Sequence, residues 1–346
     1  MEKSSLVSVV ITSFRGSKNL KRALDSVCNQ TYPLIEIIVV DDNDPDTEER
    51  KETERVMKKY ISDHSSKSIM YVRHTRNMNG AAARNTGVSN AKGEYIQLLD
   101  DDDVLFPEKI KKSVALIEQE HTDGVLCSVA SCTGTKVNII SGVRESIGLS
   151  EKRAEMMIVP GFLGTGSNVF VTKESYVELD GFDTAFNRMQ DLEFMMRFFR
   201  EHRCSLLDEI LIIKAENNRK VSWTDYRKQR DFKLKFWNKY EVDLKEAFTE
   251  EQRWAYFNLE YTHLFRIALM NESKADVQEA AERLETIRSL SRAEKLSVKY
   301  HSAYLLLHNN GWILNYVRAM KAKKPVQHQE VQVTDAERAF IEKVMR

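Results

Sequence analysis

The sequence predicts an α/β fold, a mostly parallel sheet flanked by helices, followed by an all-α carboxy-terminal domain. Strand and helix signals alternate through the first half of the chain, which is typical of parallel sheets. Four acids, Asp100 to Asp103, follow the apolar segment 94–99. After about residue 226, strand signals nearly vanish, and aromatic, leucine and charged residues recur at helical spacing to the end.

The alternation begins with a β-branched strand at residues 6–12. Ser17 can cap a helix whose apolar face holds Leu20, Ala23, Leu24 and Val27. Further strands are expected at residues 35–40, 69–72, 95–99 and 125–130, with helices near residues 80–91 and 107–120. This order predicts a parallel sheet with helices on both faces.

The pattern becomes irregular after Gly142. We expect a glycine-rich loop at residues 160–166, a strand at 168–172, a helix from about Asp191 to His202 and a strand at 206–213. We place a domain boundary near residue 224, between an α/β domain at 1–224 and a helical accessory domain at 225–346.

Charge and cysteine content exclude several classes of function. Lysine plus arginine and aspartate plus glutamate both total 52, so the chain has no overall basic field to hold nucleic acid. The four cysteines form no CxxC pair, which argues against a zinc site or a disulfide framework. No signal peptide and no apolar run near the length of a membrane span is evident. We therefore expect a cytoplasmic protein.

The acids Asp100 to Asp103 are the strongest chemical signal. They follow a predicted strand, at the edge where open α/β sheets place their ligands. Adjacent carboxylates repel one another unless a positive charge lies among them, and an Asp-x-Asp spacing suits Mg²⁺ or Mn²⁺ shared with a substrate phosphate. The alternative is an acidic turn in contact with water, which is how most charge runs behave.

The ends of the first two strands indicate how a nucleotide would bind. The turn after the first strand contains only Gly16, whereas a dinucleotide-binding turn needs three glycines, and no phosphate-binding P-loop motif occurs. Instead, Phe14 follows the first strand, and Asp41 and Asp42 follow the second. An aromatic face can stack on a base, and a carboxylate can accept a hydrogen bond from an imide N–H. Together they could recognise a pyrimidine.

Several motifs occur in an order that resembles one enzyme family. They are residues 7–14 (VSVVITSF), 23–27 (ALDSV), 30–33 (QTYP), 36–43 (EIIVVDDN), 80–87 (GAAARNTG), 93–96 (GEYI), the acids followed by Pro107 and Lys109, and 181–183 (GFD) before Gln190 and Asp191. Over roughly the first two thirds of the chain they resemble the family 2 inverting glycosyltransferases with the Rossmann-like GT-A fold. The resemblance implies a nucleotide-sugar half at about 1–103 and an acceptor half at about 104–224.

The resemblance also implies a nucleotide pocket formed by Thr12, Phe14, Asp42 and Arg84. Phe14 and Asp42 would hold the base, and the planar guanidinium of Arg84 would face phosphate or base. Taken singly, Phe14 could instead be a core residue, Asp42 part of a turn and Arg84 a surface residue.

Among the acids, the resemblance implies a division of labour. Asp102 would hold the metal ion, which would bridge the donor diphosphate, and Asp100 would contact the ribose or support the metal ligands from behind. Asp103 would be a further polar neighbour, and Asp101, in the variable position, would be solvated.

The catalytic base implied by the resemblance is Asp191, near the start of a predicted helix, with Glu193 as the second choice. An ordinary acid at a helix N-terminus is the structural alternative. Residues 164–167 form a flexible polar loop that could cradle the acceptor or be a plain turn. Where relatives carry a histidine contact after the last core strand, this chain has Glu216 and Asn217, either of which could replace it.

The predicted function is a metal-dependent transfer of sugar from a nucleotide-sugar, expected to be a UDP-sugar, to a glycan or lipid-linked saccharide, as in surface polysaccharide synthesis. Two alternatives stay open. Asp100, Asp102 and Val104 imitate the Asp-x-Asp motif of a haloacid-dehalogenase-like phosphohydrolase, and a catalytically silent nucleotide-sugar-binding scaffold would keep the same pocket.

Two segments of the carboxy-terminal third carry further expectations. The aromatic-rich segment with Trp254, Tyr256 and Phe257 is expected to be internal core. The apolar residues 312–317 precede the basic side chains Arg318, Lys321, Lys323 and Lys324. This segment could contact an anionic membrane peripherally, or be a packed helix with a solvated basic end.

Overall fold

The computed structural model describes residues 5–133, 136–141, 163–215, 225–271, 273–309 and 335–345. The chain divides into two compact units, Met1–Asn217 together with Val333–Arg346, and Asn218–Gln332. Residues 333–346 therefore group with the first unit, and not with the helical domain expected at 225–346. Glu216, Asn217 and the segment 312–324 lie outside the described residues.

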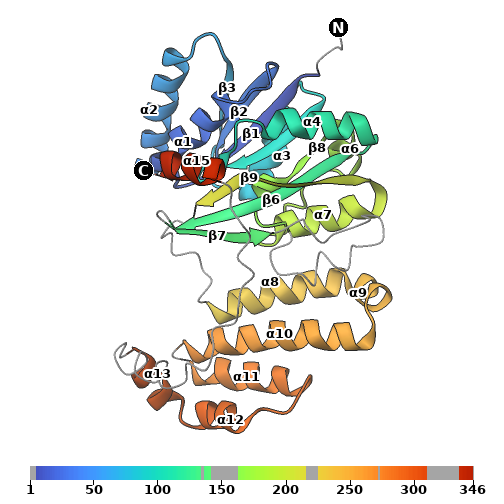
Figure 1. Ribbon diagram of the computed structural model, residues 1–346. Helices are drawn as coiled ribbons and strands as arrows, with labels where there is room; N and C mark the ends of the chain where they lie inside the picture. Colours follow the sequence, from blue (N-terminus) through green and yellow to red (C-terminus); the bar gives the residue numbers. More distant parts are fainter. Residues whose placement is uncertain are drawn as a thin grey trace. The chain divides into compact units, whose positions relative to one another are not determined.

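The first unit is built on one mixed sheet (Figure 1). Its strands are β1 (Val7–Ser13), β2 (Ile35–Asp41), β3 (Ser68–Arg73), β4 (Tyr95–Asp100), β5 (Val104–Leu105), β6 (Gly124–Thr133), β7 (Lys136–Ser141), β8 (Phe170–Thr172) and β9 (Cys204–Ala215). The order is β3-β2-β1-β4-β8-β6-β9-β5, with β7 paired to β6. The neighbours from β3 to β4 are parallel, as are β6 and β9, and the other pairs are antiparallel. This mostly parallel sheet confirms the predicted fold class.

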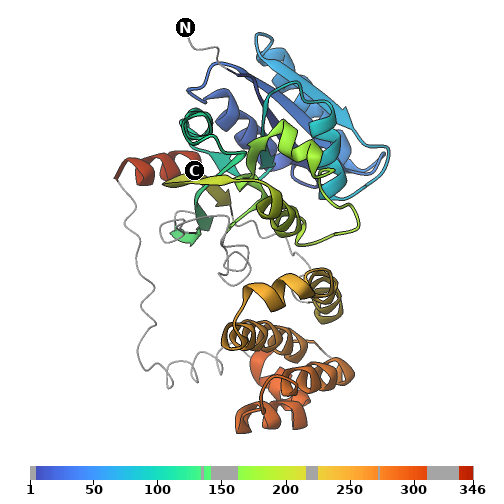
Figure 2. The same cartoon turned by 90° about the vertical axis from the view of Figure 1, so that its right-hand side faces the viewer.

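Helices cover both faces of this sheet (Figure 2). They are α1 (Ser17–Cys28), α2 (Glu48–Asp63), α3 (Gly80–Ser89), α4 (Lys109–Glu120), α6 (Lys173–Glu178), α7 (Gln190–Glu201) and α15 (Asp335–Met345). The steps from β1 to β2 and β3 run in one direction, and the next step returns past β1 to β4. Right-handed crossovers therefore place α3 on the face opposite α1 and α2. With both faces covered, β1, β2 and β4 read as nearly continuous apolar runs.

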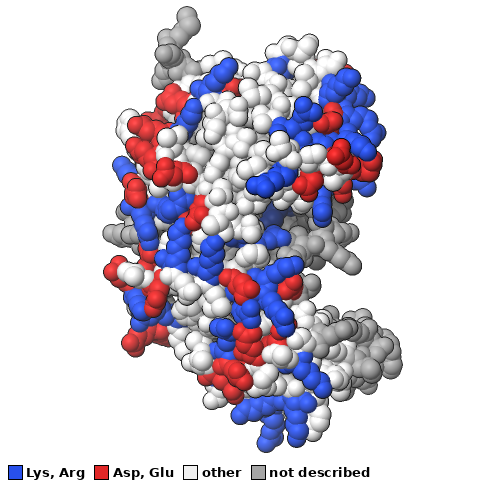
Figure 3. Space-filling model, turned by 180° about the vertical axis from the view of Figure 1, so that it is seen from behind, with Lys and Arg blue, Asp and Glu red and all other residues white. Residues whose placement is uncertain are grey.

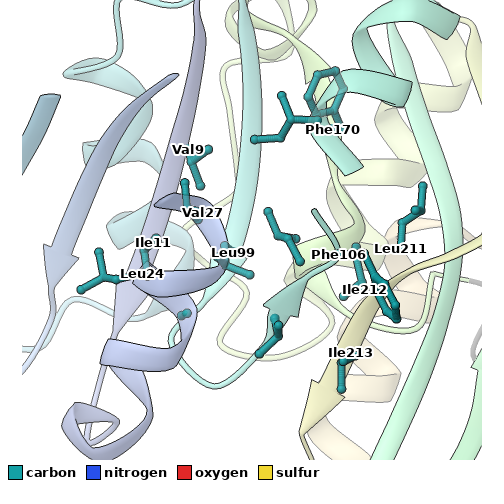
Figure 4. Close-up of a cluster of buried hydrophobic side chains, with 14 of the residues drawn as sticks. Val9, Ile11, Leu24, Val27, Leu99, Phe106, Phe170, Leu211, Ile212 and Ile213 are labelled. Carbon is teal, nitrogen blue, oxygen red and sulfur yellow. The ribbon is translucent and has the colours of Figure 1, made fainter. Parts of the chain in front are cut away.

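The core of the first unit lies between α1 and the sheet (Figure 4). Leu24 and Val27 of α1 lie beside Val9 and Ile11 of β1, and all four are at most 2% exposed. Burial of each such side chain stabilises the fold by about 1.5–3 kcal/mol. The whole predicted apolar face of this helix is buried. Its N-cap is Gly16, however, and not Ser17, which is the first helical residue.

Helix α2 was not predicted, because its sequence is densely charged and shows no apolar stripe. Its buried residues are Arg50, Thr53, Met57 and Tyr60, of which two are polar. Arg50 donates to the backbone carbonyl of His74 (2.8 Å) and forms an ion pair with Asp41 (3.3 Å). The helix is thus held to the carboxyl ends of β2 and β3 partly by polar contacts, which a hydrophobic pattern does not reveal.

The C-terminal helix α15 completes the core of the first unit. Ile341 is fully buried in the main apolar cluster, and the ring of Phe340 lies 4.5 Å from that of Phe106. Phe106 directly follows β5, a short strand that comes just after the four acids. The end of the chain therefore packs against the segment that leaves the acidic cluster.

The second unit is entirely helical in its described residues. Its helices are α8 (Tyr226–Lys239), α9 (Glu241–Ala247), α10 (Glu250–Leu269), α11 (Lys274–Glu285), α12 (Arg292–Lys299) and α13 (His301–Asn309). Capping boxes begin α10, with Thr249 and Gln252, and α12, with Ser291 and Glu294.

The expected aromatic core of α10 is only partly correct. Tyr256 is buried, but Trp254 is half exposed, with its indole N–H donating to the carbonyl of Ile287 (3.1 Å). A residue every third or fourth position reaches the interior of a helix bundle, and Trp254 lies outside that stripe.

The surface carries charges of both signs. Figure 3 shows acidic and basic side chains interspersed over the face in view, in keeping with equal totals of 52. Within the described part of the chain, every helix is too short or too polar to cross a bilayer.

Candidate active site

The candidate site lies where the chain reverses its direction across the sheet, at the carboxyl ends of β1 and β4. Thr12 pairs with Asp100 in the parallel register of these strands, and Ser13 pairs with Asp41 of β2. The Thr12 hydroxyl also donates to the Asp100 carboxylate (3.4 Å). A reversal point of this kind is where open α/β sheets form their ligand crevice.

The predicted residues Asp100 and Arg84 are joined directly. Arg84, on α3, donates from Nη2 to the Asp100 carboxylate at 2.6 Å and from Nη1 to the side chain of Gln190 at 3.1 Å. Its guanidinium also lies 5.3 Å from the ring centre of Phe182. Arg84 is therefore buried between α3, β4 and the start of α7, and not a surface residue.

The charge of Asp191 also acts on the Arg84 guanidinium. Burial alone would lower the pKa of Arg84, but the attraction of Asp100 and then of Asp191 raises it above its ordinary value. Arg84 therefore stays charged and lies among residues that come from both halves of the predicted domain.

Asp101 is not solvated, and that expectation was wrong. It is 2% exposed, and its carboxylate accepts hydrogen bonds from the Ser13 hydroxyl (2.7 Å) and the Phe14 N–H (3.2 Å). A Cβ on Gly16 would lie 1.7 Å from the same carboxylate, so only glycine fits there. The Asp101 side chain therefore packs against the carboxyl end of β1 and stabilises the turn that contains Phe14.

Asp102 and Asp103 differ in exposure. Asp102 is partly exposed, and its backbone carbonyl accepts a hydrogen bond from Arg22 (3.1 Å). Asp103 is buried and accepts hydrogen bonds from the hydroxyls of Thr165 (2.7 Å) and Ser167 (2.6 Å). Burial, followed by repulsion from Asp100 and Asp102, raises the pKa of Asp103 to about 8.

The loop at 164–167 is tied to these acids, and its hydroxyls do not face an open cradle. Ser167 and Thr165 are buried, and the Ser167 hydroxyl accepts the backbone N–H of Asp100 (2.9 Å) while donating to Asp103. Gly166 faces Arg84, because a Cβ there would lie 2.9 Å from Nη2. The loop therefore orients both Asp100 and Asp103.

The two candidate bases on α7 have different surroundings. Asp191 is partly exposed, and its carboxylate accepts the N–H of Leu192 (3.0 Å). Glu193 is fully buried and bound by Arg197 through two contacts of 2.8 Å. Arg197 also donates to the carbonyl of Gly181 (2.8 Å). Glu193 therefore holds the loop before α7 and is unsuited to the second-choice role as base.

The two residues predicted to bind the base, Phe14 and Asp42, differ in exposure. Phe14 is 39% exposed, with the Arg15 guanidinium 4.9 Å from its ring centre, so it is not a core residue. Asp42 is 2% exposed, and its carboxylate accepts from the backbone N–H of Met78 (2.7 Å) and the side chain of Asn77 (2.9 Å). Burial raises the pKa of Asp42, although hydrogen bonds from the His74 side chain and the Met78 N–H oppose the shift.

His74 is a further contact of Asp42 that sequence reasoning missed. Its Nδ1 lies 2.7 Å from the Asp42 carboxylate, and its Nε2 lies 2.9 Å from the Thr86 hydroxyl. A carboxylate only accepts, so Nδ1 carries the proton, and in the neutral ring Nε2 accepts from Thr86. His74 and Asn77 follow β3. Because open α/β sheets bind ligands at the carboxyl ends of their strands, the sequence already contained a signal for these two residues.

No cluster of three or more His, Cys, Asp or Glu side chains able to hold a metal ion occurs within the described residues.

The sequence and fold are similar to known proteins. Residues 8–178 match the model of Glycosyl transferase family 2. An uncharacterized glycosyltransferase of Haemophilus influenzae is 26% identical over 196 residues, which cover 57% of this chain and 63% of that protein. An uncharacterized glycosyltransferase of Rickettsia conorii is 28% identical, over 61% of this chain and 34% of its own length. The chain thus matches less than two thirds of the length of these relatives.

Solved structures share the fold at low sequence identity. TarS residues 1–349 of S. aureus superpose with a TM-score of 0.55 and 18% identity, covering 92% of this chain and 93% of TarS 1–349. The same protein in complex with UDP-GlcNAc gives a TM-score of 0.53 at 17% identity, covering 88% and 92%. The mannosyltransferase PcManGT of Pyrobaculum calidifontis, in complex with GDP-Man and Mn²⁺, gives 0.53 at 15% identity, covering 93% and 89%.

Proposed function

The chain belongs to glycosyl transferase family 2, and on that premise we propose that it transfers a sugar from a UDP-sugar to a glycan or lipid-linked saccharide with inversion at the anomeric carbon. The observation that carries the proposal is the position of Arg84. It is hydrogen-bonded to Asp100 on the nucleotide side and to Gln190, the residue before Asp191, on the acceptor side. Membership of this family also counts against the phosphohydrolase alternative.

Phe14 and Asp42 are the proposed contacts of the uracil base. Phe14 is 39% exposed and would stack on the base, and the peptide N–H of the same residue is bound by Asp101. Asp42, oriented by hydrogen bonds from the side chains of His74 and Asn77 and the backbone N–H groups of Met78 and Asn79, would accept the imide N–H. TarS, which shares the fold, binds UDP-GlcNAc. Thr12 and Asp100 would then face the ribose and the diphosphate.

We propose that a divalent cation, Mn²⁺ or Mg²⁺, binds at Asp102. Repulsion among the carboxylates contributes to the raised pKa of Asp103, and a positive charge beside them would relieve it. Asp102 would hold the ion together with diphosphate oxygens of the donor, and the ion would neutralise charge on the departing diphosphate. PcManGT, which shares the fold, was solved in complex with GDP-Man and Mn²⁺.

Asp191 is the proposed base. Its carboxylate takes the proton of the acceptor hydroxyl as that oxygen bonds to the anomeric carbon. The bond between that carbon and the phosphate oxygen breaks on the opposite face, and its electron pair leaves with the diphosphate. Arg84 positions both sides of this reaction, because it contacts Asp100 and Gln190 at once.

A donor screen tests the proposal. The full chain is incubated with Mn²⁺ and UDP-, GDP- and ADP-sugars, with saccharide acceptors present, and released products are identified by chromatography. UDP release together with an extended acceptor is expected. Inorganic phosphate as the product would favour a phosphohydrolase, and binding without any product would favour the silent scaffold.

A further inference from the structure

The second unit contains a cavity of about 440 Å³ between α8, α9 and α10. Its lining includes the buried or partly buried rings of Trp237, Phe257 and Tyr261, called the aromatic wall below, and the polar side chains of Asn238, Glu241, Lys245 and Arg253, called the rim. A volume in this range, with apolar walls and a few polar groups, is typical of sites for small organic ligands. None of these residues has a role in the transfer proposed above.

The aromatic wall is preformed. The Trp237 indole N–H donates to the Tyr256 hydroxyl (3.0 Å), so the indole already has its polar partner and offers carbon surface to the cavity. Phe257 stands nearly perpendicular to Trp237, with ring centres 5.3 Å apart, and the ring of Tyr261 lies 5.2 Å away. Rings packed against one another in this way hold their orientation without a ligand.

The rim distinguishes between classes of ligand. Glu241 forms an ion pair with Lys245 (2.5 Å), and Arg253 donates to the backbone carbonyl of Lys245 (2.9 Å). Glu241 offsets the charge of Lys245, and Arg253 keeps further N–H donors, so the rim offers hydrogen-bond donors and acceptors together. A hydrocarbon chain would bury these polar groups without partners, which is costly.

A neutral pyranose suits both parts of the cavity. The C–H face of the sugar ring can lie on the aromatic wall, and its hydroxyls, which both donate and accept, can bond with Asn238, Glu241 and Arg253. We propose that this cavity is a second saccharide site that holds a neutral sugar unit of the acceptor chain. The identity of the ligand as the acceptor rests on the proposed function, whereas saccharide binding itself does not.

The test is direct binding to the full chain, without a donor. Maltotetraose, chitotetraose and mannotetraose are titrated by saturation-transfer NMR. At least one is expected to bind with a Kd on the order of 0.1–5 mM. Phe257→Ala removes a wall and should weaken that binding about tenfold or more, which corresponds to roughly 1.4 kcal/mol. Asn238→Ala, at an exposed position with little effect on folding, should weaken it several-fold.

The matched control is Leu259→Ala. Leu259 lies on the same helix as Phe257 and is 50% exposed, and it does not line the cavity. Leu259→Ala should bind the saccharide as tightly as the wild type does. The proposal is overturned if none of the three saccharides binds the wild type, or if Phe257→Ala and Asn238→Ala both bind as the wild type does. Saccharide binding without sugar transfer would contradict the proposed function alone, and transfer without saccharide binding would contradict the cavity alone.

Discussion

Four consecutive aspartates at the end of β4 occupy four different environments, and this is where sequence reasoning was weakest at the residue scale. The position of the cluster at the sheet edge follows from the strand before it. The direction of each carboxylate does not, because it depends on the turn after Asp100 and on what lies beneath it. Asp101 points under β1 because Gly16 leaves room for its carboxylate, and a contact between residues so far apart in sequence has no local signal.

Asp101→Asn should therefore lower the stability of the fold, whereas Asp102→Asn should lower the transfer activity. The Ser13 hydroxyl and the Phe14 N–H both donate to Oδ2 of Asp101, and the neutral amide oxygen of asparagine would accept them more weakly than the carboxylate does. The expected loss is about 1–3 kcal/mol of unfolding free energy, measured by urea denaturation. Asp102→Asn should keep wild-type stability and lose most Mn²⁺-dependent transfer. Equal stability of both variants would contradict the supporting role of Asp101.

Asp191→Asn should separate binding from chemistry. The substitution keeps the shape of the side chain but cannot accept the acceptor's proton, so transfer should fall by roughly 10²- to 10⁴-fold. Affinity for UDP, measured by calorimetry with Mn²⁺, should change little, because the base acts on the acceptor. The control is Asp183→Asn, which removes a carboxylate from the loop before α7 and should leave the transfer rate close to that of the wild type. An Asp191→Asn enzyme with near wild-type turnover would show that another group takes the proton.

At the scale of elements, hydrophobic pattern predicted what apolar packing determines. The strands at β1, β2 and β4 and the apolar face of α1 follow directly from it. Helix α2 was missed because polar contacts of Arg50 help to hold it, and β5 was missed because a two-residue strand is too short to show a period. The loop at 164–167 could be located, but its attachment to Asp103 depends on the antiparallel return of β8 beside β4.

The start of α12 should show a measurable dependence on pH. The hydrogen bond from Arg288 lowers the pKa of Glu294 to about 2, with help from Ser291 and against partial burial. Because the folded pKa lies below the unfolded one, this pair stabilises the fold above about pH 4.5, and the effect is lost as pH falls toward 2. Glu294→Gln should cost about 1–3 kcal/mol at pH 7, allowing for partial solvent screening.

The measurement is the urea midpoint by circular dichroism at pH 7, 4 and 2.5. The difference between wild type and Glu294→Gln should shrink as the pH falls. A difference that stays constant over this range would mean that the carboxylate charge does not stabilise the helix start. Glu285→Gln, at the end of α11, serves as the control for removing a carboxylate elsewhere in the unit.

At the scale of the whole molecule, ligand binding should report on the first unit through the unfolding of the full chain. If Phe14 stacks on uracil and Asp42 accepts its imide N–H, UDP with Mn²⁺ should raise the thermal midpoint more than GDP or ADP does. A ligand at 100 times its Kd stabilises the folded state by about 2.7 kcal/mol. Differential scanning fluorimetry measures the shift. A larger shift with a purine nucleotide would contradict the proposed base pocket.

The place of α15 in the core sets an order of events during synthesis. The surface around Phe106 is completed by Phe340 and Ile341, which are translated after the whole helical unit. At about 5–20 residues per second, roughly 130 residues separate Ala215 from Met345, so this apolar surface stays uncovered for roughly 7–26 seconds. During that interval the nascent first unit exposes an apolar surface next to its acidic loop. Chaperone binding should therefore concentrate on ribosomes stalled between these two positions, and end once the last helix has emerged.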